Sequence, residues 1–190
     1  MLHDKLKDYK LILASGSPRR QQFFKDLNLD FEIRLKEIEE VYPPDLKREE
    51  ITNYLAELKS NAFEGTLADH EILITSDTIV WHNDKALGKP KDKEDAFSIL
   101  KSLSNSTHEV ITSVCFKTKD KKEVLFDVTK VTFNIISNEA ITYYIDKYKP
   151  FDKAGAYGIG FIGVSKIEGS YPNVMGLPVD KVYHYLSNLA

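Results

Sequence analysis

The chain of 190 residues has a single cysteine and no long apolar run. One cysteine excludes an intramolecular disulfide framework and a multi-cysteine zinc site. Cys115 lies in an apolar stretch, which favours a buried small side chain over a nucleophile. No stretch approaches the roughly 18 apolar residues of a membrane span, and the first eight residues lack the apolar segment of a signal peptide. We therefore expect a cytoplasmic protein without a membrane partner.

The sequence also lacks an excess of positive charge. Lys and Arg number 26 against 29 Asp and Glu, which gives a formal net charge of −3 at pH 7. Nucleic-acid-binding proteins that rely on phosphate contacts usually carry a basic surface, so nucleic acid is not an expected partner. An anionic small molecule needs only a local cluster of positive charge. Hydrophobic residues make up 42% of the chain, enough for the core of one domain with up to two lobes.

Strand and helix patterns alternate along the chain. Apolar runs and period-two alternation predict strands over 10–13, 31–35, 71–76 (ending at Asp77-Thr78 and resuming over 79–81), 108–117 and 123–136. Amphipathic spacing predicts helices near 18–27, 47–64, 92–103, 137–148 and 179–188. The charged turn between the last two strands indicates an antiparallel hairpin, whereas the earlier units suit crossovers. The pattern therefore predicts an α/β fold with a mixed sheet.

The strongest candidate for a ligand-binding loop is residues 14–20, with the sequence ASGSPRR. A strand that ends in small residues and turns at once into a helix exposes backbone N–H groups, which together with the helix dipole favour an anion. Ser17 suits the N-cap and Pro18 the first helical position. Arg19 and Arg20 add planar donor forks that match phosphate. An ordinary capped helix with solvated arginines explains this stretch equally well.

Asp77 is the best candidate for a catalytic carboxylate. It is the last residue of a strongly apolar strand, before Thr78, where a carboxylate can face a crevice. Carboxylates are seldom left unpaired in apolar surroundings. We interpret Asp77 as a metal ligand or as a general base that activates water, with a turn-forming cap as the alternative.

Further charged positions can reach the same crevice. Lys89, in a Gly-Lys-Pro turn, would complement phosphate charge, although a solvated surface lysine is the commoner case. Lys59 falls at the border of the apolar face of helix 47–64, from which it either reaches the crevice or snorkels. The acidic cluster of residues 37–40, which ends at Glu40, offers oxygen ligands for Mg²⁺ or Mn²⁺, and a solvated acidic loop explains the same spacing.

Several common catalytic motifs are missing. The sequence indicates no Ser-His-Asp or Cys-His set, and its histidines are scattered without ligand spacing. It contains no GxGxxG pattern and no Walker A pattern, so the usual dinucleotide and P-loop interpretations fail.

Six ordered motifs resemble the Maf family of nucleoside triphosphate pyrophosphatases, over nearly the whole chain. They are ASGSPRR at 14–20, DT at 77–78, GKP at 88–90, THEV at 107–110, KAGAY at 153–157 and GSYPNVMGLP at 169–178. The resemblance implies a single domain over residues 1–190 with the elongated α/β Maf fold, similar to inosine triphosphate pyrophosphatases. That fold has a mixed sheet, flanking helices and a cleft between two lobes. A homodimer is implied by the resemblance alone.

The resemblance also implies a reaction and its catalytic residues. Family members hydrolyse a nucleoside triphosphate between the α- and β-phosphates, which gives a monophosphate and pyrophosphate, with a divalent metal such as Mg²⁺ or Mn²⁺. Asp77 matches the family's proposed general base. Lys59, Lys89 and Glu40 match residues around the phosphates and the metal, which Asp77 and Glu40 would hold.

Substrate-binding positions follow by the same resemblance. Ser15 and Arg20 match the phosphate-gripping loop, and Arg19 and Thr78 match positions tied to base choice in the subfamily acting on dTTP and UTP. The expected substrates are therefore dTTP and UTP, with modified pyrimidine nucleotides as further candidates. The alternatives are a 7-methyl-GTP pyrophosphatase and a non-enzymatic nucleotide-binding regulator of septum formation.

The sequence departs from that subfamily at one place. The subfamily continues Ala-Tyr-Gly-Ile with a Gln linked to base recognition and a few more residues, whereas here residues 156–159 run directly into Gly160. We expect either a shortened loop or a mobile segment that this numbering omits. The missing Gln weakens the dTTP and UTP assignment, but Arg19 and Thr78 keep it ahead of 7-methyl-GTP.

Overall fold

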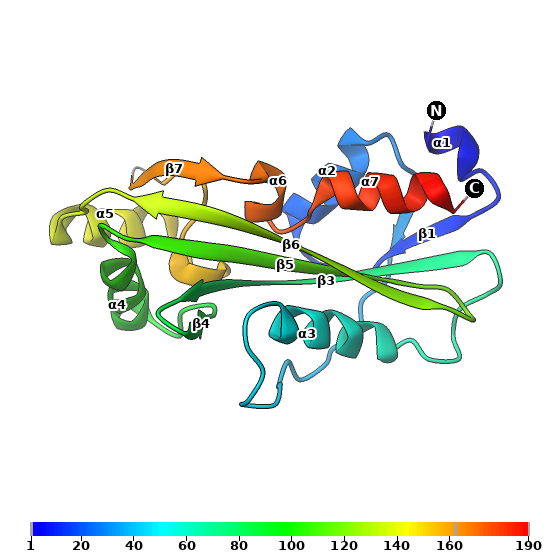
Figure 1. Cartoon of the computed structure of the whole chain (residues 1–190), viewed down its shortest axis with the longest axis horizontal. Helices are drawn as coiled ribbons and strands as arrows, with labels where there is room; N and C mark the ends of the chain where they lie inside the picture. Colours follow the sequence, from blue (N-terminus) through cyan, green and yellow to red (C-terminus); the bar gives the residue numbers. More distant parts are fainter. Residues whose placement is uncertain (1, 162, 190) are drawn as a thin grey trace.

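The computed structural model describes residues 2–161 and 163–189, and the molecule is elongated along its longest strands (Figure 1). Within these residues one mixed sheet has the strand order β2-β1-β3-β5-β6-β7, with β4 paired to β3. The strands are β1 (Lys10–Leu13), β2 (Phe31–Ile33), β3 (Glu71–His82), β4 (Lys85–Leu87), β5 (Thr107–Lys117), β6 (Lys122–Phe133) and β7 (Val164–Glu168). β1 is parallel to β2 and β3, and the remaining pairs are antiparallel. The predicted mixed α/β sheet is confirmed.

Helices flank this sheet on both sides and at one end (Figure 1). They are α1 (Leu2–Lys5), α2 (Pro18–Asp26), α3 (Glu49–Asn61), α4 (Lys93–Leu103), α5 (Asn138–Tyr148), α6 (Tyr171–Val174) and α7 (Val179–Asn188), with a 3₁₀ turn at Ala154–Ala156. No helix in the described part of the chain is long and apolar enough to cross a membrane.

The two faces of β3 are covered differently, because successive side chains of a strand point to opposite faces. On one face Ile72 and Ile74 pack in a cluster with α2 and α7, whereas Val80 packs in a second cluster with α4 and α5. The polar residues Ser76 and Thr78 lie between these two clusters on the same face. The core is therefore divided into two lobes that share one continuous strand.

α3 covers the other face of β3. Ile51 and Leu55 of the helix pack with Ile79 and Trp81 of the strand, and Asp77 is the next residue on this face. Thr75 donates a 2.6 Å hydrogen bond to the carbonyl of Ala56 in α3. The adjacent residues Asp77 and Thr78 therefore point to opposite sides of the sheet.

Three sequence predictions near the site were wrong in detail. β3 does not end at Asp77-Thr78, because β5 pairs with it without a break from Leu73 to Trp81. The second strand ends at Ile33, and Leu35 is 59% exposed. Tyr54, whose spacing from Ile51 and Leu58 predicts the core face of helix 47–64, is exposed as well.

Other local predictions are confirmed. The helices expected from about residues 92 and 137 begin there: Asp92 caps α4 by accepting a hydrogen bond from the backbone of Asp95, and Ser137 caps α5 in the same way. The final helix spans Val179–Asn188. Cys115 is completely buried, and this burial raises the pKa of its thiol, as suits a core residue.

Gly155 provides a test of the packing beside the cleft. It adopts φ = +69°, and a Cβ atom there would lie 2.6 Å from Val80 Cγ2. We expect Gly155→Ala to lower the free energy of unfolding by about 1–3 kcal/mol more than Gly65→Ala does. Gly65 has the same φ of +69° but nothing within 4 Å, so it isolates the backbone strain. Equal losses in urea unfolding would contradict this account.

Candidate active site

The cleft begins where β3 lacks a neighbouring strand on one side. β1 pairs with β3 only as far as Ile74, and β4 begins to pair at Val80. No strand in the described chain pairs with residues 75–79 on this side. Backbone polar groups in such a gap need other partners, because an unpaired buried group costs about 1–3 kcal/mol.

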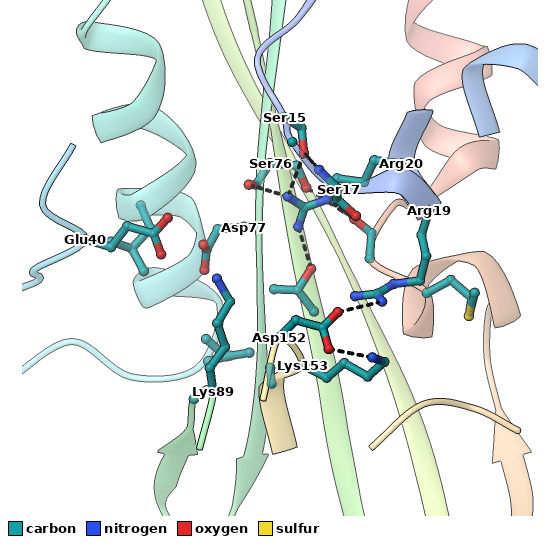
Figure 2. Close-up of a pocket in the computed structure, with 18 of the residues that line it drawn as sticks. Ser15, Ser17, Arg19, Arg20, Glu40, Ser76, Asp77, Lys89, Asp152 and Lys153 are labelled. Atoms are coloured by element: carbon teal, nitrogen blue, oxygen red, sulfur yellow. Dashed lines mark hydrogen bonds and ion pairs between the residues drawn. The ribbon is translucent and has the colours of Figure 1, made fainter. Parts of the chain in front are cut away.

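Arg20, in the first turn of α2, supplies one such partner and further hydrogen bonds around the gap (Figure 2). Its Nη1 donates to the carbonyl of Ser76 at 3.0 Å and to Ser15 Oγ at 3.4 Å. Its Nη2 donates to Thr78 Oγ1 at 3.0 Å, and its Nε donates to the carbonyl of Gly176 at 2.7 Å. Most of the guanidinium donors are therefore committed to the protein, and Arg20 joins the loop after β1, the middle of β3 and the segment after α6.

The predicted capping of α2 is partly wrong. Ser17 is the N-cap residue and Pro18 opens the helix, but the Ser17 side chain makes no capping hydrogen bond. Instead, the backbone N–H of Ser17 donates to Ser15 Oγ at 3.3 Å. Ser15 is buried, so its hydroxyl links the loop to Arg20.

Asp77 and Lys59 form a close ion pair on the α3 side of the strand. Lys59 Nζ lies 2.6 Å from Asp77 Oδ1 and 3.1 Å from Glu40 Oε1, and the side chains of Asp77 and Lys59 are 9% and 17% exposed. In Figure 2, Lys89 points toward the carboxylates of Asp77 and Glu40. Partial burial would raise the pKa of Glu40, but the charges of Lys59, Lys89 and Arg20 outweigh it and hold that pKa below its usual range.

A second charged group lies near the 3₁₀ turn. Asp152 Oδ2 lies 3.5 Å from Arg19 Nη1, and Asp152 Oδ1 lies 2.5 Å from Lys153 Nζ (Figure 2). Burial would raise the pKa of Asp152, but Lys153 and Arg19 outweigh it and lower the pKa. The sequence interpretation gave Asp152 and Lys153 no role. The only signal in the sequence for this pair was the KAGAY motif, which begins at Lys153. The contact between Asp152 and Arg19 gave no sequence signal, because these residues lie 133 positions apart.

All of the predicted site residues line one cleft. They are Ser15, Arg19, Arg20, Glu40, Lys59, Asp77, Thr78 and Lys89. Apolar side chains complete the walls, among them Leu55, Val80, Tyr157, Ile159 and Val174. The cleft encloses about 1430 Å³, beyond the roughly 300–1,000 Å³ of most small-molecule pockets. It therefore has room for a base, a sugar and several phosphates together.

The donor set for a metal consists of two carboxylates. No group of three or more His, Cys, Asp or Glu side chains within residues 2–161 and 163–189 is placed to hold a metal. Asp77 and Glu40 nevertheless converge on one cation, Lys59 Nζ. Mg²⁺ commonly uses one or two protein carboxylates plus substrate phosphates, so these residues fit a metal that arrives with a triphosphate. Of the predicted acidic cluster, Glu37 also lines the cleft and Glu39 does not.

The stretch that lacks the expected Gln forms a tight turn. The backbone N–H of Phe161 donates to the carbonyl of Gly158 at 2.9 Å, and Gly158 and Gly160 both line the cleft. At this part of the cleft wall the described chain therefore offers two glycines and no glutamine side chain. Ile162, which follows in the same stretch, lies outside the described residues.

Tyr157 is fixed behind the cleft wall by a buried histidine. Its hydroxyl lies 2.7 Å from His108 Nε2, and both rings pack against Phe133. Among the described residues His108 Nδ1 has no hydrogen-bond partner. Burial, together with the neighbouring His82, lowers the pKa of His108 to about 3. The imidazole is therefore neutral in the folded protein.

We expect this neutral histidine to make the protein less stable in mild acid. The unfolded chain takes up a proton near the ordinary histidine pKa of about 6.5, whereas the folded chain does not until about 3. Stability is therefore complete above about pH 6.5 and falls by up to about 1.4 kcal/mol per pH unit below it. His108→Gln should flatten urea-derived unfolding free energies between pH 7 and 5, whereas the exposed His70→Gln should not. An unchanged slope in His108→Gln would refute this assignment.

The fold and cleft together define a class of protein that binds a polyanionic ligand beside a lysine-paired carboxylate. Residues 10–189 match the family model described as "Maf-like protein", and the chain belongs to the Maf family. The chain is 70% identical to the "dTTP/UTP pyrophosphatase" of Flavobacterium johnsoniae, with 100% of both chains covered. It is 63% identical to the protein of the same name from Flavobacterium psychrophilum, covering 99% of this chain and 98% of that one.

Among solved structures, the chain resembles the Staphylococcus aureus Ham1 protein. The TM-score is 0.54 at 12% sequence identity, covering 95% of this chain and 100% of the Ham1 chain. At this identity the likeness concerns the fold alone.

Proposed function

We propose that this Maf protein hydrolyses dTTP and UTP between the α- and β-phosphates, releasing the nucleoside monophosphate and pyrophosphate. The observation that carries the proposal is the Asp77 carboxylate, held 2.6 Å from Lys59 within a cleft lined by further cations. The names of relatives that are 63–70% identical over nearly the whole chain support dTTP and UTP as the substrates.

Hydrolysis of a phosphoanhydride needs an oriented water and stabilisation of developing charge more than covalent help. Asp77 accepts the proton of the attacking water. Lys59 orients that carboxylate through Oδ1, which leaves Oδ2 for the water. Lys89, which lines the same cleft, offsets the negative charge of the phosphates.

Asp77 and Glu40 would also hold a divalent metal, Mg²⁺ or Mn²⁺. When bound, such an ion supplies positive charge at a phosphate oxygen. Ser15 and Arg20 keep the loop before α2 in place against the phosphates, and Arg19 and Thr78 take part in choosing the base.

The proposed activity also implies where the protein acts and what it binds. A nucleoside triphosphate pool makes the cytoplasm the expected location, with neither nucleic acid nor a membrane as a partner. Homodimerisation and the single-domain boundary at 1–190 stay predictions.

Asp77→Asn tests the catalytic step. The change keeps the shape and removes the base, so we expect an unaltered circular dichroism spectrum and a loss of turnover of about 10²–10⁴-fold. Pyrophosphate release from dTTP, UTP and 7-methyl-GTP is measured with Mg²⁺ and with Mn²⁺. Normal turnover in Asp77→Asn would refute the role of Asp77. No release by the unmodified protein would favour the non-enzymatic regulator, and release mainly from 7-methyl-GTP would overturn the choice of substrate.

Glu40→Gln tests the metal site. Loss of one of two carboxylate ligands should raise the concentration of Mn²⁺ needed for half-maximal activity about 10- to 100-fold. Glu39→Gln is the matched control, because Glu39 is an exposed neighbour that does not line the cleft. Identical metal titrations of the two variants would exclude Glu40 as a ligand.

A further inference from the structure

The GKP, THEV and KAGAY motifs meet behind one wall of the cleft. Only Lys89, in the GKP motif, has a role in the proposed reaction. Its side chain is exposed, lines the cleft and points toward the carboxylates of Asp77 and Glu40 (Figure 2). A lysine carries a point charge on a flexible four-carbon stem, so the side chain does not fix its own position. The location of this charge therefore depends on what holds the backbone of the GKP turn.

One backbone hydrogen bond joins the GKP turn to the 3₁₀ turn of the KAGAY motif. The N–H of Gly155 donates to the carbonyl of Gly88 at 3.1 Å, one residue before Lys89. The donating turn is strained, because the non-glycine residue Ala156 follows Gly155 with a φ of +59°. Such a residue keeps a positive φ only where the surrounding structure holds it there. Ala156 is completely buried, so its neighbours provide that hold.

The ring of Tyr157 packs against this strained turn and is itself anchored by His108. A Cβ atom on Gly155 would lie 2.6 Å from Val80 Cγ2 and 3.3 Å from Tyr157 Cε1, so the turn is packed between β3 and the Tyr157 ring. The hydroxyl of that ring lies 2.7 Å from Nε2 of the buried His108, a residue of β5 that does not line the cleft. The turn therefore connects Lys89 to a side chain of the central sheet.

We propose that His108 is a positioning residue for Lys89, which it holds through Tyr157, the strained turn and the carbonyl of Gly88. This inference rests on the proposed function, in which Lys89 offsets the charge of the phosphates. Without the hydrogen bond between Tyr157 and His108, the Tyr157 ring is free to shift and the turn relaxes away from Gly88. Lys89 then moves with its backbone. A misplacement of about 1 Å far from the chemistry can lower a rate about 10²-fold.

Tyr157→Phe tests this inference, because phenylalanine keeps the ring and removes only the hydroxyl. We expect kcat/KM for UTP to fall about 10- to 100-fold. In a Lys89→Ala protein the same change should cost less than about twofold, because no ammonium is left to position. His108→Leu should show the same dependence on Lys89. Circular dichroism and the thermal midpoint establish that each variant folds.

Tyr144→Phe is the matched control. Tyr144 lies in the same core cluster as Tyr157, and its hydroxyl accepts a hydrogen bond from the N–H of Gly158 at 2.9 Å, beyond the strained turn. Its effect on kcat/KM should be the same with and without Lys89, as for independent sites. A Tyr157→Phe loss that is equally large in both backgrounds would overturn the inference, because a merely structural loss adds to the loss of Lys89. The same dependence on Lys89 in Tyr144→Phe would also overturn it.

Amide hydrogen exchange tests the link to Gly88 directly and needs no turnover. The N–H of Gly155 should exchange at least about tenfold faster in Tyr157→Phe than in the unmodified protein, because its hydrogen bond to Gly88 opens more often. Unchanged exchange in the folded variant would overturn the inference. If Tyr157→Phe does not fold, the same measurement on His108→Leu decides the question.

Binding separates this inference from the proposed function. The Kd of α,β-imido UTP, measured by calorimetry with and without Lys89 and with and without the Tyr157 hydroxyl, gives the same coupling without turnover. A protein that hydrolyses no nucleotide but shows this coupling in binding would refute the proposed activity and support the inference. Hydrolysis of UTP by the unmodified protein, together with Tyr157→Phe losses that do not depend on Lys89, would refute the inference alone.

Discussion

The guanidinium of Arg20 lies where a neighbouring strand would otherwise pair with β3, and the cleft depends on this arrangement. The edge of β3 is open between the end of β1 and the start of β4. Arg20 lies in this gap and donates hydrogen bonds to the Ser76 carbonyl and the Thr78 hydroxyl of β3 and to the carbonyl of Gly176. A strand in this position would close the gap and leave no room for a ligand. A side chain satisfies the same backbone acceptor from one side and leaves space for a ligand on the other.

The strand behind this gap separates two kinds of chemistry. Because side chains alternate along a strand, Asp77 lies with Lys59 on the α3 face and Thr78 lies with Arg20 on the other. Both residues still line one cleft, since no strand closes the sheet beside them in the described chain. Adjacent positions in the sequence thus reach the cleft from opposite faces, at a separation fixed by the backbone.

Features that depend on neighbouring residues were predictable from the sequence. The loop of residues 14–20 and the helix starts near Asp92 and Ser137 are examples, because turn and capping chemistry acts within a few residues. The continuity of β3 was not predictable, because four polar residues interrupt its apolar pattern and the pairing with β5 overrides it.

The contacts of the arginines also escaped prediction. Both were expected to face phosphate, but the partners of Arg20 lie up to 156 positions away along the chain, and Asp152 reaches Arg19 from a different lobe. The eight candidate residues do share one cleft. Their individual roles stay predictions, because position alone does not establish chemistry.

Three cations of the cleft, Arg19, Lys59 and Lys153, are paired with carboxylates of the protein. Lys59 contacts Asp77 and Glu40, and Asp152 contacts Arg19 and Lys153. An incoming anion must therefore compete with internal partners, and its affinity reflects an exchange of counterions. Such an exchange favours a densely charged triphosphate over a less charged monophosphate. The ion pairs of Lys59 and Asp152 would thus re-form as the monophosphate leaves, and their re-formation would help to release it.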